Sequence, residues 1–179
     1  MVVSKAAKRY AKAFFEIAQE KGSLEVVAED FAGISTAIEA SEELVNFLKA
    51  PLISSEKRVE VLNALFSGKV NSLTLELLLF LERKGRLNVT QQTLGEFAVL
   101  HDQFKNVQRI SITSAFTMAD AQVEAIKKRL SEKLNKNIEA DVAVDASLIG
   151  GFKIKVGDQV HDLSVVTQLN KVRQSIVKA

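Results

Sequence analysis

The residues of this chain that could do chemistry are few. Residues 67–69 read Ser-Gly-Lys, like the end of a phosphate-binding loop. Such a loop needs a glycine five positions before Gly68, and Asn63 stands there. Gly150-Gly151 precedes an alternating apolar pattern and not a helical one, so it forms no phosphate cradle at a helix N-terminus. The sequence therefore predicts no nucleotide-binding loop, and tight backbone packing is the favoured role of the two glycines.

The sequence also gives no support for a metal site or for a pair of acid–base residues. The two histidines, His101 and His161, are far apart in the chain, and there is no cysteine. A zinc site would therefore have to be completed by scattered carboxylates. Asp158 and Asp162 flank an expected turn and an expected helix start, where aspartate commonly accepts backbone N–H groups. We expect no catalytic residue, no metal and no cofactor.

Composition narrows the class of protein further. The net charge of +2 creates no overall basic field for nucleic acid or a membrane surface. Without cysteine the chain forms no disulfide, which suits a reducing compartment. The longest apolar run, 77–81, is far shorter than the ~20 residues that span a bilayer, and the N-terminus lacks a signal-peptide pattern. We expect a cytosolic chain whose contact with a membrane runs through partners.

Residues 1–105 show helical periodicity and little else. Serines at expected N-caps, glycines at expected C-caps and the single proline divide them into six segments. The segments run through 10–18, about 24–40, a short stretch after Ser41, from Ser54 or Ser55 to Gly68, 72–84, and 88 to about 105. Short connections between helices of this length predict an antiparallel bundle.

At about residue 106 the pattern changes to alternation. Strands are expected through 110–116 and 138–144, with a helix between them at 119–136. A hairpin then turns at Gly157-Asp158, and a helix closes the chain. The fold class is therefore α+β: an all-α six-helix bundle at 1–105, then a small α/β module at 106–179 with the order strand, helix, strand, hairpin, helix. Acids on the second strand are expected to pair with Lys153 and Lys155 on the next.

Two helices carry more apolar surface than a bundle needs. The apolar arc of the first covers about 200°, twice the usual stripe, and the fifth is apolar nearly all round. In one interpretation the fifth helix lies at the centre of the bundle. In the other, the two helices line a groove for an amphipathic helix of a partner. The residues concerned are Tyr10, Ala13, Phe14, Ile17, Leu77, Phe80 and Leu81.

The helix at 119–136 carries a basic cluster. It consists of Lys127, Lys128, Arg129, Lys133 and Lys136. The cluster is either a solvated face or a surface for an acidic partner helix. A small nucleic-acid-binding or regulatory protein that uses this helix is the alternative function.

The stretch 148–176 resembles a family signature. It has an apolar-x-Gly-Gly-apolar segment, then Gly-Asp-x-Val-x-Asp-x-Ser-Val, then a helix with spaced apolar residues. The matching positions are Gly150, Gly151, Gly157, Asp158, Val160, Asp162, Ser164 and Val165, with Leu163 as a departure where relatives carry a small residue. Residues 9–15 (Arg-Tyr-Ala-Lys-Ala-Phe-Phe) and 84–87 (Lys-Gly-Arg-Leu) extend the match. In this ordered set the chain is similar to the delta subunit of F-type ATP synthase, the relative of the mitochondrial oligomycin-sensitivity-conferring subunit.

The resemblance implies a non-catalytic stator subunit of a proton-translocating ATP synthase. In that family the first and fifth helices receive the N-terminal helix of an alpha subunit, which favours the groove interpretation. The C-terminal module would bind the b subunits of the peripheral stalk. The protein would then be a monomer within a hetero-oligomeric complex, peripheral to the cytoplasmic side of the cell membrane. It would hold the catalytic head still while the rotor turns.

Overall fold

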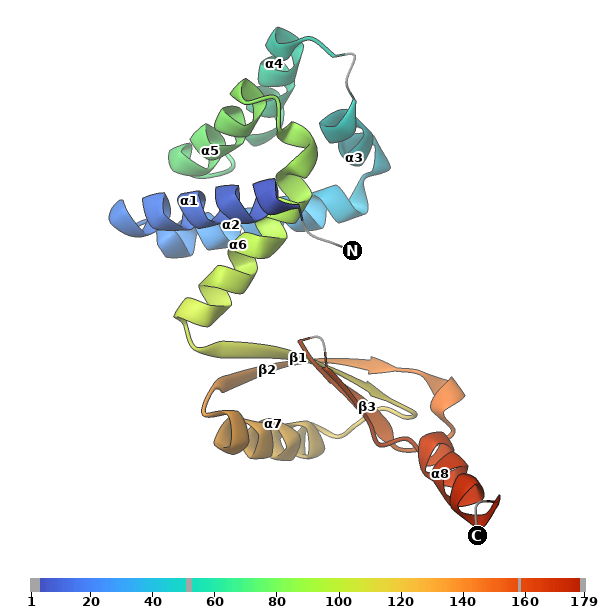
Figure 1. The fold of residues 1–179 in the computed structure, drawn as a ribbon. Coiled ribbons are helices and arrows are strands. Elements are labelled where there is room, and N and C mark those ends of the chain that lie inside the picture. The colour runs from blue at the N-terminus through green and yellow to red at the C-terminus, as the bar shows by residue number, and fades with distance from the viewer. Residues whose placement is uncertain (1–3, 51–52, 158, 178–179) are drawn as a thin grey trace. The chain divides into compact units, whose positions relative to one another are not determined.

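The computed structural model describes residues 4–50, 53–157 and 159–177 (Figure 1). The chain divides into two compact units between His101 and Asp102. This division lies inside the last helix of the first unit, four residues before the boundary expected from the change of pattern. Each unit has its own apolar core.

The N-terminal unit is helical throughout its described residues. Its elements are α1 (Lys5–Glu20), α2 (Leu24–Ala40), α3 (Glu42–Lys49), α4 (Ser55–Phe66), α5 (Ser72–Arg83), the 3₁₀ turn η1 (Leu87–Val89) and α6 (Thr90–Phe104).

Side-chain caps set where several of these helices begin. Ser4, Ser41 and Ser54 each accept a hydrogen bond from a backbone N–H in the first turn of α1, α3 and α4. Ser23 is an expected cap as well, but its hydroxyl donates to the carbonyl of Lys21 instead. Gly22, at φ +64°, reverses the chain there.

The core of the N-terminal unit contains three phenylalanines whose rings pack together. Phe31 and Phe97 pack edge to face with ring centroids 4.8 Å apart, and the Phe14 centroid lies 6.5 Å from that of Phe31. Helix α5 contributes more buried side chains than the other helices of the unit: Leu73, Thr74, Leu77, Leu78, Leu81 and Glu82. Most of α5 therefore lies in the core, as the central-helix interpretation predicts. The part of α5 that is not buried decides whether a partner helix can bind there.

Across its described residues, the C-terminal unit is a four-stranded mixed sheet with two α-helices. Its elements are β1 (Val107–Ser114), α7 (Asp120–Leu134), β2 (Asn137–Val144), η2 (Ala146–Leu148), β3 (Phe152–Val156), β4 (Gln159–Asp162) and α8 (Val165–Val177). The strand order is β2-β1-β3-β4. β1 and β2 are parallel and joined through α7, while β3 runs antiparallel to both of its neighbours. The α+β class is confirmed.

One face of this sheet is apolar and the other is charged. Ile110, Ile112, Ile138 and Ile154 pack against partly buried side chains of α7. On the opposite face, the sequence predicts that acids of β2 pair with lysines of β3. That prediction is wrong, because β1 lies between those strands. Instead Arg109 pairs with Glu139 at 3.2 Å, and Lys153 pairs with Asp162 at 3.3 Å.

Candidate functional site

A hollow of about 290 Å³ lies between α1 and α5. We call it the groove. Its lining is Ala13, Phe14, Ile17, Lys21, Leu73, Glu76, Leu77, Phe80 and Arg83. Five of the seven residues proposed from the sequence are among these, so the fold brings them together.

The aromatic residues show how the groove is built. The Phe80 ring packs edge to face against Tyr10 and Phe14, with centroids 6.3 and 6.2 Å apart. Phe14 is 1% exposed and belongs to the core, whereas Phe80 is 37% exposed. The Lys84 ammonium lies 5.5 Å from the centroid of the Phe80 ring. Phe80 is therefore the aromatic side chain of the groove that a partner can reach.

Leu81 does not line the groove. It is fully buried and belongs to the core of the N-terminal unit. One residue along a helix turns the side chain by about 100°, which carries Leu81 away from the side of Phe80. The sequence predicts Leu81 in the partner site, whereas the structure places it in the core.

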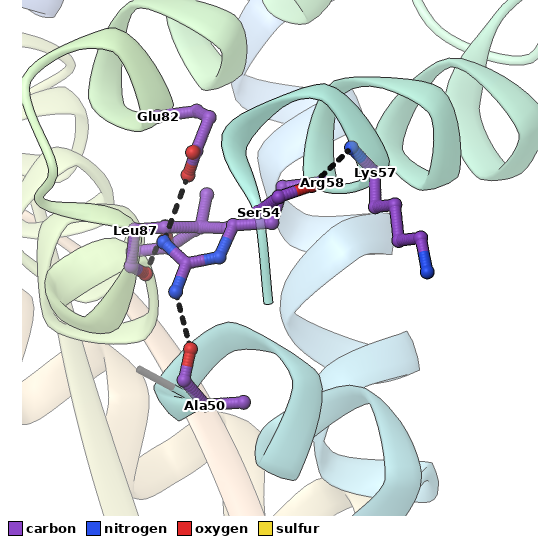
Figure 2. A network of polar contacts seen from close by, with 7 residues as sticks. Ala50, Ser54, Lys57, Arg58, Glu82 and Leu87 are labelled. Atoms are coloured by element: carbon purple, nitrogen blue, oxygen red, sulfur yellow. Dashed lines mark hydrogen bonds and ion pairs between the residues drawn. The ribbon is translucent and has the colours of Figure 1, made fainter. Parts of the chain in front are cut away.

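The side of α5 opposite the groove is held by a partly buried arginine (Figure 2). Arg58 of α4 donates through Nη1 to Glu82 Oε2 at 3.3 Å and through Nη2 to the carbonyl of Ala50, at the end of α3. The Glu82 side chain is 3% exposed and that of Arg58 is 14% exposed. Arg58 Nε is buried and has no hydrogen-bond partner among the described residues. This contact, the Arg58–Glu82 clamp, ties α3, α4 and α5 together.

The beginning of α5 is held from α2. Asp30 Oδ2 accepts a hydrogen bond from the backbone N–H of Asn71 at 2.7 Å and another from the Thr74 hydroxyl at 2.6 Å. The Asn71 side chain in turn accepts from the N–H of Leu73. A carboxylate at this position also suits the positive end of the helix dipole. Both ends of the helix that carries Phe80 are thus fixed by polar contacts.

The glycine pair of the C-terminal signature sits in a tight corner. Gly151 has φ +78°, and a Cβ there would lie 2.5 Å from the carbonyl oxygen of Leu163. A Cβ on Gly150 would lie 2.9 Å from Val165 Cγ2. Gly157 has φ +58° but open space around it. Asp158 lies outside the described residues.

Asp162 and Ser164 organise the start of α8. The Asp162 carboxylate accepts a hydrogen bond from the Ser164 N–H at 2.9 Å, and Ser164 Oγ accepts one from the Thr167 N–H. Hydrogen bonds from Ser164 hold the pKa of Asp162 well below its usual range. Both side chains therefore hold the turn between β4 and α8, and neither is set up for proton transfer.

A set of exposed apolar side chains gathers at one end of the sheet. Pairing of Ser114 with both Val144 and Phe152 brings the exits of β1 and β2 next to the entry of β3. The residues are Phe116, Val144, Ile149 and Leu163, between 48% and 72% exposed. We call this set the end surface.

The comparisons with known proteins decide the family. A family model described as ATP synthase delta (OSCP) subunit matches residues 6–176. The chain belongs to this family. It is 31% identical to ATP synthase subunit delta of Syntrophomonas wolfei over 100% of this chain and 98% of that one. It is 35% identical to the same subunit of Chlorobaculum tepidum over 96% and 95%.

A solved structure shows the same fold. The chain matches one from the mitochondrial ATP synthase hexamer of Toxoplasma gondii with a TM-score of 0.76 and 23% identity, over 97% of this chain and 98% of that one. Members of the delta (OSCP) family are non-catalytic structural subunits of ATP synthase, in its stator. The expectation of a non-enzymatic subunit is therefore confirmed by family membership.

The family match gives no support to the alternative function, nucleic-acid binding through the basic cluster on α7. Lys127 pairs with Glu124 at 2.7 Å, and Lys128, Arg129 and Lys133 are exposed.

No group of metal-ligating side chains occurs within the described residues. Across those same residues, every helix is too short or too polar to cross a bilayer.

Sequence reasoning missed the Arg58–Glu82 clamp and the Asp30 cap. A signal for the first was present: Glu82 is four residues after Leu78, on the side of α5 that is otherwise buried. A charge at such a position indicates a buried partner, but only the fold identifies it as Arg58.

Proposed function

We propose that this delta-family subunit links the catalytic head of an F-type ATP synthase to the peripheral stalk, so that the head does not turn with the rotor. The observation that carries the proposal is the open apolar groove between α1 and α5. A second apolar surface, the end surface, lies on the other unit. A linker needs a binding surface for each of two partners.

The groove suits the N-terminal helix of an alpha subunit. Its lining is mainly apolar, with charged side chains at its rim, which is the pattern for holding an amphipathic helix. From Tyr10 to Lys21, α1 extends about 16 Å, which offers room for about three turns of a partner helix. Contact residues would be Tyr10, Ala13, Ile17, Leu77 and Phe80, while Phe14 and Leu81 support them from the core.

The end surface suits a helix of the b subunits. It contains Ile149, which is 70% exposed and has φ +61°, an unfavourable backbone conformation for a β-branched residue. Such strain persists where the surrounding structure enforces it, and here Gly150 and Gly151 form the corner beside it.

With these two partners, the subunit would be one copy in a hetero-oligomer, held at the cytoplasmic side of the membrane through its partners.

The first prediction tests the groove. Replacing Phe80 with glutamate should weaken binding of a synthetic alpha N-terminal peptide by at least tenfold. The change removes an aromatic anchor worth about 1.5–3 kcal/mol and places a carboxylate that must be desolvated. Isothermal titration with the full chain measures the effect, and circular dichroism checks that the helices remain.

The matched control is Val99→Glu on α6. Val99 is 48% exposed and is not among the residues that line the groove. This variant should bind the peptide like the unmodified chain. Undiminished binding by Phe80→Glu would remove the groove from the proposed site, and equal loss in both variants would show that the peptide binds elsewhere.

A further inference from the structure

The groove has a basic end. α1 and α5 run antiparallel along it, since Tyr10 meets Phe80 while Lys21 meets Glu76 at the opposite end. Beyond Phe80, α5 ends with Arg83, which lines the groove, followed by its C-cap Lys84. On α1, the exposed Arg9 lies one turn before Ala13, on the same side of the helix. These three cations form the basic end.

The other end of the groove is acidic. Glu76 lines it and pairs with Lys21 at 3.7 Å, with both side chains more than half exposed. Glu16 and Glu20 follow on α1, each three residues after a groove residue and each exposed. Lys12 reaches Glu16 at 3.8 Å. We call Glu16, Glu20 and Glu76 the acidic end. Even with Lys12 and Lys21 included, the three carboxylates leave this end with an excess of negative charge.

Opposite charges at the two ends of an apolar groove affect the direction in which a helix binds more than they affect its affinity. The apolar floor can hold the apolar face of a helix in either direction, whereas charges at the rim match in one direction and repel in the other. Each exposed pair changes an equilibrium by about twofold, so several pairs together give a preference on the order of tenfold.

We propose that the groove selects the direction in which its partner helix lies. The acidic half of the partner helix contacts Arg9, Arg83 and Lys84, and its basic half contacts Glu16, Glu20 and Glu76. The inference rests on the proposed function, because it concerns the same groove and the same class of partner. It adds the charge pattern that a helix must carry, and in which order, to be held correctly.

Two designed peptides test the direction. They share one apolar face, but the first carries glutamate in its first two turns and lysine in its last two, and the second carries the reverse. Each has a nitroxide label at its N-terminus, and amide NMR signals of the full chain report which groove end is broadened. The first peptide should broaden residues 9–11 and 82–84, and the second residues 19–21 and 73–76. An alpha N-terminal peptide, labelled at either end, should place its more acidic half at the basic end.

Variants separate direction from affinity. Arg83→Gln with Lys84→Gln should reduce the preference from about tenfold toward about threefold while the dissociation constant changes by less than about threefold. The matched control Lys128→Gln with Arg129→Gln removes the same charge from α7 and should leave the preference unchanged.

The possible outcomes are distinguishable. If both designed peptides lie in the same direction, or if the alpha peptide lies with its acidic half at the acidic end, the charge mechanism is wrong while the groove remains a binding site. If the designed peptides fail to bind, the labelled alpha peptide alone decides between the two directions. If no peptide binds, the proposed function of the groove fails, and this inference fails with it.

Discussion

At the scale of single residues, two glycines of the C-terminal signature show how different demands produce the same residue type. Gly151 combines a positive φ with a neighbouring backbone carbonyl that leaves no space for a Cβ. Gly157 also has a positive φ, but no neighbouring atom lies within 4 Å of the place that a Cβ would take. At position 157 only the positive φ favours glycine. At position 151 the positive φ and the close Leu163 carbonyl both favour it.

This difference gives the second prediction. Gly157→Ala should cost about 1 kcal/mol of unfolding free energy, the strain of a side chain at positive φ. Gly151→Ala should cost at least about 2 kcal/mol, because the Leu163 carbonyl must also move. Urea denaturation of the two variants provides the comparison. Equal costs would show that the corner relaxes without resistance and that packing against the Leu163 backbone is not what requires Gly151.

At the scale of elements, α5 is the helix on which the proposed function depends. Asp30 holds its beginning, and the Arg58–Glu82 clamp holds its end, next to Phe80 and Arg83. A buried ion pair adds little net stability, because desolvation of both charges offsets their attraction. We therefore infer that the clamp sets the position of α5 and adds little to the stability of the fold.

The third prediction follows from this interpretation. Arg58→Met alone should lower stability by about 3 kcal/mol, since Glu82 would keep a buried charge without its partner. The double variant Arg58→Met/Glu82→Leu should recover most of that loss, because neither charge remains. Thermal melting gives the stability, and alpha-peptide titration gives the effect on the groove.

The two measurements on the double variant distinguish position from stability. We expect restored stability with affinity still several-fold weaker than in the unmodified chain, because the polar contact that fixes the end of α5 is then lost. Full recovery of both stability and affinity would show that the clamp is not what fixes the position of α5. Arg58→Lys is the control that keeps the charge while losing the two-sided geometry of the guanidinium.

At the scale of the whole molecule, the chain is two units with separate cores and separate candidate surfaces. The division lies between His101 and Asp102, within α6. The end of α6 carries side chains of the second unit, because Asp102 accepts a hydrogen bond from Arg109 of β1 at 2.7 Å. A linking subunit can be built in this way, with one unit for each partner.

The fourth prediction is that the N-terminal unit folds alone. A fragment of residues 1–105 retains α6 to its last residue and the complete first core. It should show helical circular dichroism, melt cooperatively and bind the alpha peptide with the affinity of the full chain. A fragment that melts without cooperativity would show that the second unit is needed for the fold of the first.

The sequence by itself determined the local structure and the family. Serine caps, glycine stops and the change from helical to alternating apolar pattern depend on neighbours a few residues apart, so they predicted the elements and the α+β class. The ordered glycine, aspartate and serine positions of the signature predicted membership of the delta family, which the comparisons confirm. It also predicted which helices carry surplus apolar surface, and five of seven proposed residues line the groove.

Only the tertiary structure decided contacts between distant parts of the chain. It placed Leu81 in the core and Phe80 at the surface, because the rotation of α5 is set by packing against several helices at once. It put β1 between β2 and β3, so the expected pairing of acids with Lys153 and Lys155 does not occur. It also joined Arg58 to Glu82. Such pairings depend on long-range packing, which local periodicity does not encode.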